Sequence, residues 1–238
     1  MKKLNFLKDV FFLLISKTSS DILVASYPKT GSTLLRKRLV LATTDSSTIS
    51  HKIVNNRSPE IGHGRIQIGR RSPMIIKTHN WLISGLLNIT TILTVRSPFE
   101  TVASYYEYRC RIGLNGDLTF IEFWRSKMGI TLYIKYLEFI KSNKGKSRFI
   151  VHDYDKMLEG TENFFAELLM ELGLVTARSI EEIYQLTSRA SSVIEEKVSC
   201  DNSLSGFSSK KEYSHYIKDL EDSDVELLNY ATILYEEL

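Results

Sequence analysis

A glycine-containing turn between a short apolar run and a helix-like stretch constrains the fold more than any other feature. The run Ile22–Ser26 is typical of a buried strand, the turn Tyr27–Thr33 reads Y-P-K-T-G-S-T, and the stretch Leu34–Ala42 follows. A helix N-terminus offers unpaired backbone N–H groups and about half a positive charge, and glycine lets the backbone approach an anion. The sequence therefore predicts a phosphate-binding loop that carries its own lysine and two hydroxyl donors.

Three more short apolar runs are candidates for buried strands, and polar loops or helix signals follow each of them. They are Met74–Lys77, Thr91–Val95 and Phe149–Val151. Strands separated by helices predict a parallel sheet covered on both faces. We expect an α/β fold, a single-domain three-layer sandwich with a central parallel sheet and a P-loop, as in nucleoside kinases. No internal repeat or clear linker appears, so residues 1–238 are taken as one domain.

Helix boundaries are marked by capping signals. Pro98 follows Ser97 at a plausible first helical position, and that pattern runs to about Arg111. Thr119 and Glu122 form a capping-box sequence that opens a long segment to about Ser142, which Gly129 is expected to break. The remaining expected helices are an amphipathic N-terminal one and the segments Thr161–Gly173, Ser179–Val198 and Asp222–Leu238.

Charge and cysteine usage exclude several classes. The net charge of +3, from 31 basic and 28 acidic residues, is too balanced to indicate nucleic acid, yet it is compatible with a small anionic ligand in a local basic pocket. The two cysteines lie in no metal-binding pattern, which favours a cytoplasmic protein. The longest uninterrupted apolar run near the N-terminus, Val10–Ile15, is too short to span a bilayer, which needs about 20 residues. Oligomeric state is left open.

The lysine placement in the turn distinguishes it from the common triphosphate loop. That loop reads G-x-x-x-x-G-K-S/T, whereas here Lys29 precedes Gly31 and a serine follows the glycine directly. The lysine that normally meets the β- and γ-phosphates is therefore missing from its place. A P-loop nucleotide kinase is kept as an alternative.

The turn resembles the 5'-phosphosulfate loop of the cytosolic-type sulfotransferases, which use 3'-phosphoadenosine 5'-phosphosulfate (PAPS) and usually read Y-P-K-S/T-G-T/S-T-W. The resemblance implies that Lys29 contacts the bridging oxygen and the sulfonate. The residues that would hold the 5'-phosphate are Thr30, Gly31, Ser32 and Thr33. The family often has a tryptophan that stacks on adenine where this chain has Leu34, so adenine packing must come from elsewhere.

A second motif, K-T-H, ends the strand candidate at residue 77. It is similar to the K-x-H of the same family, which implies that His79 is the general base and that Lys77 neutralises charge on the sulfonate. The chemistry asks for both groups. A hydroxyl is a poor nucleophile, so a base with a pKa near neutrality is useful, and the leaving phosphate needs fixed positive partners.

A third motif resembles the family's 3'-phosphate signature, in which a strand-end arginine is followed eight residues later by a helical serine. Arg96 and Ser104 have that spacing, and arginine can hold a phosphate through two parallel hydrogen bonds. Tyr154 matches a family tyrosine near the nucleotide. Weaker matches are the pair Thr187-Ser188 and, in place of a late R-K-G element that is not visible, Lys210-Lys211.

Together these motifs imply a sulfotransferase that moves a sulfonate from PAPS to a hydroxyl or amine of an unidentified small-molecule acceptor and releases 3',5'-diphosphoadenosine (PAP). No metal is expected, because the lysines carry the charge that magnesium carries in kinases. Besides the kinase, a non-catalytic nucleotide-binding protein on the same scaffold is kept as an alternative, because the tryptophan and the R-K-G element are absent.

Overall fold

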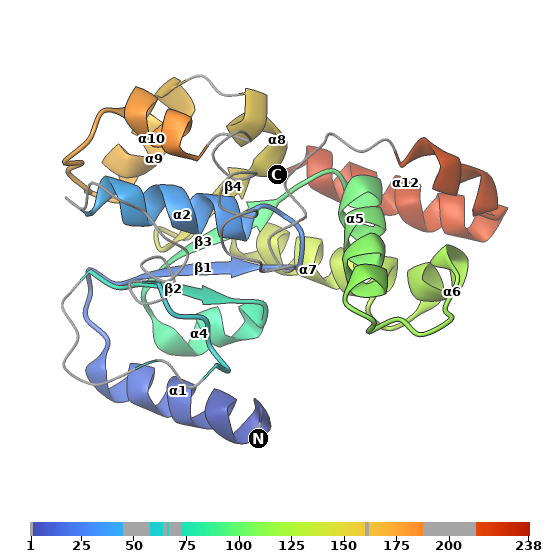
Figure 1. Ribbon diagram of the computed structural model, residues 1–238, viewed down its shortest axis with the longest axis horizontal. Helices are drawn as coiled ribbons and strands as arrows, with labels where there is room; N and C mark the ends of the chain where they lie inside the picture. Colours follow the sequence, from blue (N-terminus) through green and yellow to red (C-terminus); the bar gives the residue numbers. More distant parts are fainter. Residues whose placement is uncertain (1, 45–57, 64–65, 67–72, 160–161, 188–212) are drawn as a thin grey trace.

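Four short parallel strands form the centre of the molecule (Figure 1). The computed structural model describes residues 2–44, 58–63, 66, 73–159, 162–187 and 213–238. The strands are β1 (Ile22–Ser26), β2 (Ile75–Thr78), β3 (Thr90–Val95) and β4 (Phe149–Asp153), in the order β2-β1-β3-β4. All adjacent pairs are parallel, so the loops that follow the strands meet at one edge of the sheet.

The strands are apolar on both faces because helices cover both. Alternate residues of β1 belong to two separate clusters: Leu23 and Ala25 face one, and Ile22 and Val24 face the other. This is the pattern expected of a parallel sheet buried on both sides. The residues are therefore part of two cores rather than one, as a three-layer sandwich requires.

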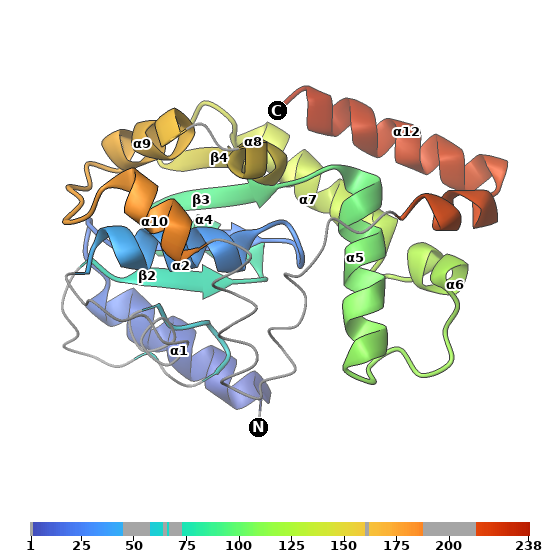
Figure 2. The ribbon, with the colours of Figure 1, turned by 45° about the horizontal axis from the view of Figure 1, so that its top comes forward.

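One face of the sheet is covered by helices that follow β1 and β4. They are α2 (Ser32–Ala42), α8 (Tyr154–Glu159), α9 (Glu162–Glu171) and α10 (Ile180–Leu186). The opposite face is covered by α1 (Lys2–Ser16), the 3-10 helix η1 (Trp81–Ile83), α4 (Ser84–Leu87) and α7 (Ile130–Asn143). Both ribbon views show the sheet between these two layers (Figure 2).

Further helices lie beyond the carboxyl ends of the strands (Figures 1 and 2). They are α5 (Pro98–Arg111), α6 (Phe120–Arg125), the 3-10 helix η2 (Ser214–Asp219) and α12 (Asp222–Glu236). Arg125 of α6 makes two hydrogen bonds to the buried carboxylate of Asp224, of 3.1 Å and 2.7 Å, and this ties α6 to α12. These elements wall the end of the sheet at which the predicted site residues lie.

The predicted fold class is confirmed, and most predicted elements appear with ends shifted by one or two residues. The capping box of Thr119 and Glu122 is present, and the segment it opens breaks into α6 and α7 at Gly129. The break has a steric cause, since a Cβ at this glycine would lie 2.1 Å from the carbonyl oxygen of Trp124. The predicted helix Ser179–Val198 is described only as far as Leu186 and Thr187.

Within the described ranges, no helix is both long enough and apolar enough to cross a bilayer. The N-terminal helix α1 is amphipathic, as expected. Its buried side includes Leu13 and the carboxylate of Asp9, which accepts a 2.8 Å hydrogen bond from the backbone N–H of Gly62. This contact fastens the segment 58–63 beside β2.

Candidate active site

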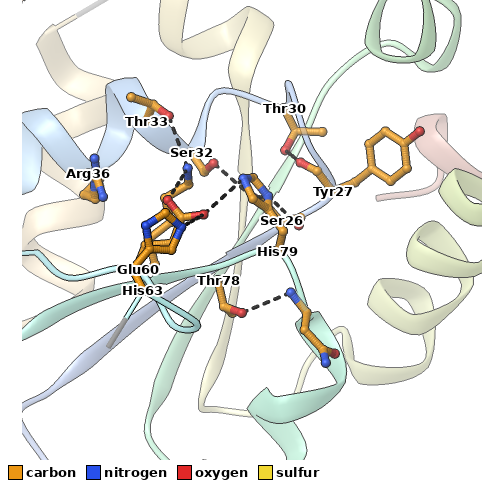
Figure 3. A network of polar contacts seen from close by, with 12 residues as sticks. Ser26, Tyr27, Thr30, Ser32, Thr33, Arg36, Glu60, His63, Thr78 and His79 are labelled. Atoms are coloured by element: carbon orange, nitrogen blue, oxygen red, sulfur yellow. Dashed lines mark hydrogen bonds and ion pairs between the residues drawn. The ribbon is translucent and has the colours of Figure 1, made fainter. Parts of the chain in front are cut away.

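The loop between β1 and α2 curls over the carboxyl end of the sheet (Figure 3). Lys29 and Gly31 both have positive φ, of 73° and 89°. Glycine takes this conformation without steric cost, whereas at Lys29 it costs roughly 1–2 kcal/mol. At Gly31 the ring of Tyr154 also leaves no space, because a Cβ would lie 2.1 Å from its Cδ2. The turn therefore requires glycine at position 31 on two independent grounds.

Buried contacts hold this loop in its conformation. The hydroxyl of Thr30 donates to the carbonyl of Tyr27 at 2.8 Å and lies 2.8 Å from the hydroxyl of Thr94 on β3. The phenol of Tyr27 donates to the carbonyl of Met128 at 2.5 Å, just before α7. These contacts fix the loop to the sheet on one side and to the α6–α7 junction on the other, so the left-handed residues are held in place.

A chain of hydrogen bonds links the loop to His79, which follows β2. The hydroxyl of Ser26 donates to that of Ser32 at 3.0 Å and lies 3.0 Å from His79 Nδ1. Its one proton is thereby used, so it accepts from Nδ1, as does the carbonyl oxygen of Ser26 at 3.3 Å. Nδ1 therefore carries the proton and Nε2 keeps its lone pair, the tautomer that a base acting through Nε2 requires.

Lys77 of β2 lies on the same side of the loop as His79. Its ammonium is 3.5 Å from the hydroxyl of Thr33 and 3.1 Å from Oε2 of Glu60, and its side chain is 9% exposed. The other carboxylate oxygen of Glu60 lies 3.8 Å from His79 Nε2. Figure 3 shows Thr33, Glu60 and His79 gathered in one region of the site.

Burial and charge set the protonation states of this group. Burial, with the positive charge of Lys77, lowers the pKa of His79 to about 3, so the imidazole is neutral at pH 7 and can accept a proton. Burial also raises the pKa of Glu60, but Lys77 and His79 outweigh it and bring that pKa down to about 2. Burial lowers the pKa of Lys77, and the carboxylate of Glu60 opposes that shift.

Lys29 points away from this group toward α5. Its ammonium lies 4.9 Å from the centroid of the Tyr108 ring. An ammonium over an aromatic face is attracted by the ring quadrupole. The ammonium groups of the two predicted lysines therefore lie in different places. That of Lys77 lies beside Thr33 and Glu60, and that of Lys29 lies beside α5.

Arg96 follows β3 and is held by its backbone. The Tyr133 phenol donates to its carbonyl at 2.6 Å and accepts from its N–H at 3.2 Å. The guanidinium pairs with Glu100 at 2.6 Å and Asp155 at 3.7 Å, and lies 4.9 Å from the centroid of the Tyr154 ring. An anion arriving here would compete with both carboxylates for the guanidinium.

The remaining predicted residues that the structure describes lie on or next to the helices around the loop. Ser104 is buried on α5, two turns after Arg96, and Leu34 is buried in the cluster that also contacts Tyr154. Thr187 accepts a 3.2 Å hydrogen bond from Arg38 on α2. Ser188, Lys210 and Lys211 lie outside the described residues.

The structure thus places Lys29–Thr33, Lys77, His79, Arg96 and Tyr154 at or just after the carboxyl ends of the four strands. Sequence reasoning missed Glu60 and Asp155, which pair with Lys77 and Arg96. Glu60 lies in a polar stretch with no periodic pattern. Its pairing with Lys77 becomes evident only from the position of this stretch beside β2. Among the described residues, no group of three or more His, Cys, Asp or Glu is arranged to hold a metal ion.

A three-layer α/β fold with a phosphate-type loop after β1 defines a P-loop protein. The sulfotransferase domain model matches residues 19–225, and the chain therefore belongs to the sulfotransferase domain family. The predicted family and enzyme class are confirmed. A search of curated proteins finds no significant match.

Solved structures share the fold. Retinol dehydratase in complex with androsterone and the inactive cofactor PAP is 14% identical, with a TM-score of 0.68, and covers 95% of this chain and 84% of that chain. The complex of retinol dehydratase with retinol and PAP is 13% identical, with a TM-score of 0.71 and the same coverage of both chains. Mouse sulfotransferase SULT7A1 complexed with PAP is 17% identical, with a TM-score of 0.64, over 97% of this chain and 89% of that chain.

Proposed function

We propose that the protein transfers a sulfonate from PAPS to a hydroxyl or amine of a small-molecule acceptor, with His79 as general base. The observation that carries this proposal is the orientation of His79: Ser26 occupies Nδ1, and Nε2 remains beside Lys77 and Glu60 at the phosphate-type loop. A neutral base and a cation therefore lie next to the same carboxylate, that of Glu60. The PAP held by the similar structures supports PAPS as the donor.

The donor would lie along the loop. Its 5'-phosphate would meet the backbone N–H groups and hydroxyls of residues 30–33, and Lys29 and Lys77 would face the sulfonate and the leaving oxygen. Arg96 and Ser104 would hold the 3'-phosphate, with Tyr154 beside the nucleotide. Binding energy from the distant phosphate then positions the reacting sulfur.

Transfer would be an in-line displacement at sulfur. The acceptor oxygen or nitrogen forms a bond to sulfur while its proton passes to Nε2 of His79. The bond between sulfur and the phosphate oxygen breaks, and PAP leaves with the electron pair. Lys29 and Lys77 stabilise the charge on the sulfonate and the leaving group, so we propose a reaction without a metal ion.

Retinol and androsterone, the ligands of the similar structures, both carry a hydroxyl group, which supports a small hydroxylated acceptor here. A cytoplasmic location is also proposed, from the cysteine usage. Cys110 is an exposed free thiol, which suits a reducing compartment.

The test is mass spectrometry for a product heavier by one sulfonate, after incubation with PAPS and hydroxylated acceptors. Lys29→Ala and His79→Ala should each lower turnover by roughly 100-fold or more. The matched controls are Lys135→Ala and His215→Ala, both exposed and far from the loop in sequence. Full turnover in both site variants would refute the assignment. Tight PAP binding without transfer to any acceptor would favour a non-catalytic nucleotide-binding protein.

A further inference from the structure

Glu60 is held beside β2 by backbone pairing rather than by its side chain alone. The N–H of Lys77 donates to the carbonyl of Pro59 and the N–H of Ile61 donates to the carbonyl of Lys77, both at 2.9 Å. This forms a parallel bridge between residues 60 and 77, and Asp9 fastens the same segment through Gly62. The carboxylate is therefore placed at Lys77 by the fold.

The two oxygens of that carboxylate face different partners. Oε2 accepts a hydrogen bond from Lys77 Nζ, while Oε1 lies 3.8 Å from His79 Nε2 and 3.9 Å from His63 Nε2. His79 Nε2 is the nitrogen left without a proton, so the carboxylate is directed at the atom where the acceptor's proton would arrive. An imidazolium formed there gains an anionic partner.

We propose that Glu60 is a positioning residue for sulfonate transfer, which keeps Lys77 charged and at the loop and stabilises the protonated His79 that the reaction creates. This inference rests on the proposed function. The proton that leaves the acceptor stays on Nε2 and is not passed to Glu60. The carboxylate acts through its charge on both neighbours and touches neither sulfur nor phosphate.

Among the charged and titratable groups around Lys77, Glu60 opposes the influences that lower the pKa of the ammonium. Arg36 on α2 lowers the pKa of Lys77, as burial does, whereas Glu60 raises it. His79 is neutral at pH 7, and the largely exposed His63 lies beside Glu60, 3.9 Å from its Oε1. Without Glu60, nothing among these neighbours would favour the ammonium.

The first test is the pH dependence of turnover. Glu60→Gln keeps the size of the side chain and removes its charge. We expect kcat to fall roughly 10- to 100-fold, because a displaced Lys77 no longer meets the sulfonate, with little change in the KM for PAPS. The alkaline limb of the kcat profile should move to lower pH, and Glu60→Asp should restore it in part. A variant that is only less stable would leave that limb in place, and this result would overturn the proposal.

The second test needs no acceptor. The Cε resonance of Lys77, assigned by its loss in Lys77→Arg, is followed by NMR during a pH titration of protein with ¹³C-labelled lysine. The midpoint should fall in Glu60→Gln and stay unchanged in the control Glu236→Gln, an exposed residue of α12. Equal midpoints in the wild type and Glu60→Gln would overturn the proposal. A shifted midpoint in a protein that transfers no sulfonate would count against the proposed function while upholding the coupling between Glu60 and Lys77.

Discussion

At the scale of single residues, the site depends on groups whose surroundings leave little choice of residue or protonation state. Gly31 has a left-handed backbone under the Tyr154 ring, and His79 has one nitrogen fixed by Ser26. Both conditions were set by neighbours distant in sequence.

Gly31→Ala should destabilise the protein and weaken PAP binding. The substitution forces an L-residue into positive φ and drives its Cβ into Tyr154, so we expect the free energy of unfolding to fall by roughly 1–3 kcal/mol. Gly85→Ala is the matched control, because a Cβ there meets nothing within 4 Å and the residue lies in α4. Chemical denaturation compares the two. Equal stability of both variants would contradict the steric argument.

The pH profile should lack the acid limb of an ordinary histidine. His79 must be neutral to accept a proton, and its pKa of about 3 moves protonation far below pH 5. With saturating PAPS, kcat/KM for the acceptor should stay nearly level from pH 7 to pH 5. For a histidine of pKa 6.5, kcat/KM would fall about 25-fold over the same range. A limb near pH 6.5 in steady-state assays would show that the burial and Lys77 effects are absent.

At the scale of elements, the junction of α6 and α7 supports the loop at residues 27–33. Gly129 lets α7 begin against the backbone of Trp124, and the preceding Met128 accepts the hydrogen bond of Tyr27. A feature that looks like a helix break in the sequence is therefore also a support for the loop 100 residues away.

Gly129→Ala should damage both stability and turnover. A Cβ 2.1 Å from a backbone oxygen cannot be relieved by a side-chain rotation, so α6 and α7 must separate, at a cost of roughly 1–3 kcal/mol. Met128 then moves away from Tyr27. Thermal unfolding and the transfer assay measure the two effects. Tyr27→Phe removes only the hydrogen bond and should lower turnover with a smaller loss of stability; unchanged turnover in both variants would refute the support role.

Most elements were predictable from local patterns, because their signals lie within a few residues. The strand–loop–helix at residues 22–42, Pro98 and the capping box of Thr119 are examples. Site residues could be predicted only where they belong to one short motif, as Lys77 and His79 belong to K-T-H. Glu60 could not, since its contact arises from strand pairing between segments that no local pattern relates.

At the scale of the whole molecule, the grips proposed for the donor are spread across all four strands. Arg96 follows β3 and is separated from Lys77 by β1. A ligand with two distant phosphates should therefore stabilise the folded protein more than a ligand with one phosphate does.

PAP should raise the melting temperature more than 5'-AMP does. At a free concentration of 100 times Kd, a ligand stabilises by about 2.7 kcal/mol, which for a domain of this size is roughly 5–10 °C. Arg96→Ala should reduce the PAP shift to that of AMP, whereas Arg148→Ala, which precedes β4 at the opposite end of the sheet, should not. Scanning calorimetry gives both shifts. An undiminished preference for PAP in Arg96→Ala would remove this arginine from the 3'-phosphate grip.

The order β2-β1-β3-β4 separates two tasks in space. Under the proposed function, the acceptor meets the protein at the β2 border, where the segment 58–63 lies, and the nucleotide extends toward β4. Mutations at one border can alter the choice of acceptor while the other continues to recognise the same donor. A lineage of such enzymes can thus diversify its substrates by changing one margin of the sheet and inheriting the other intact.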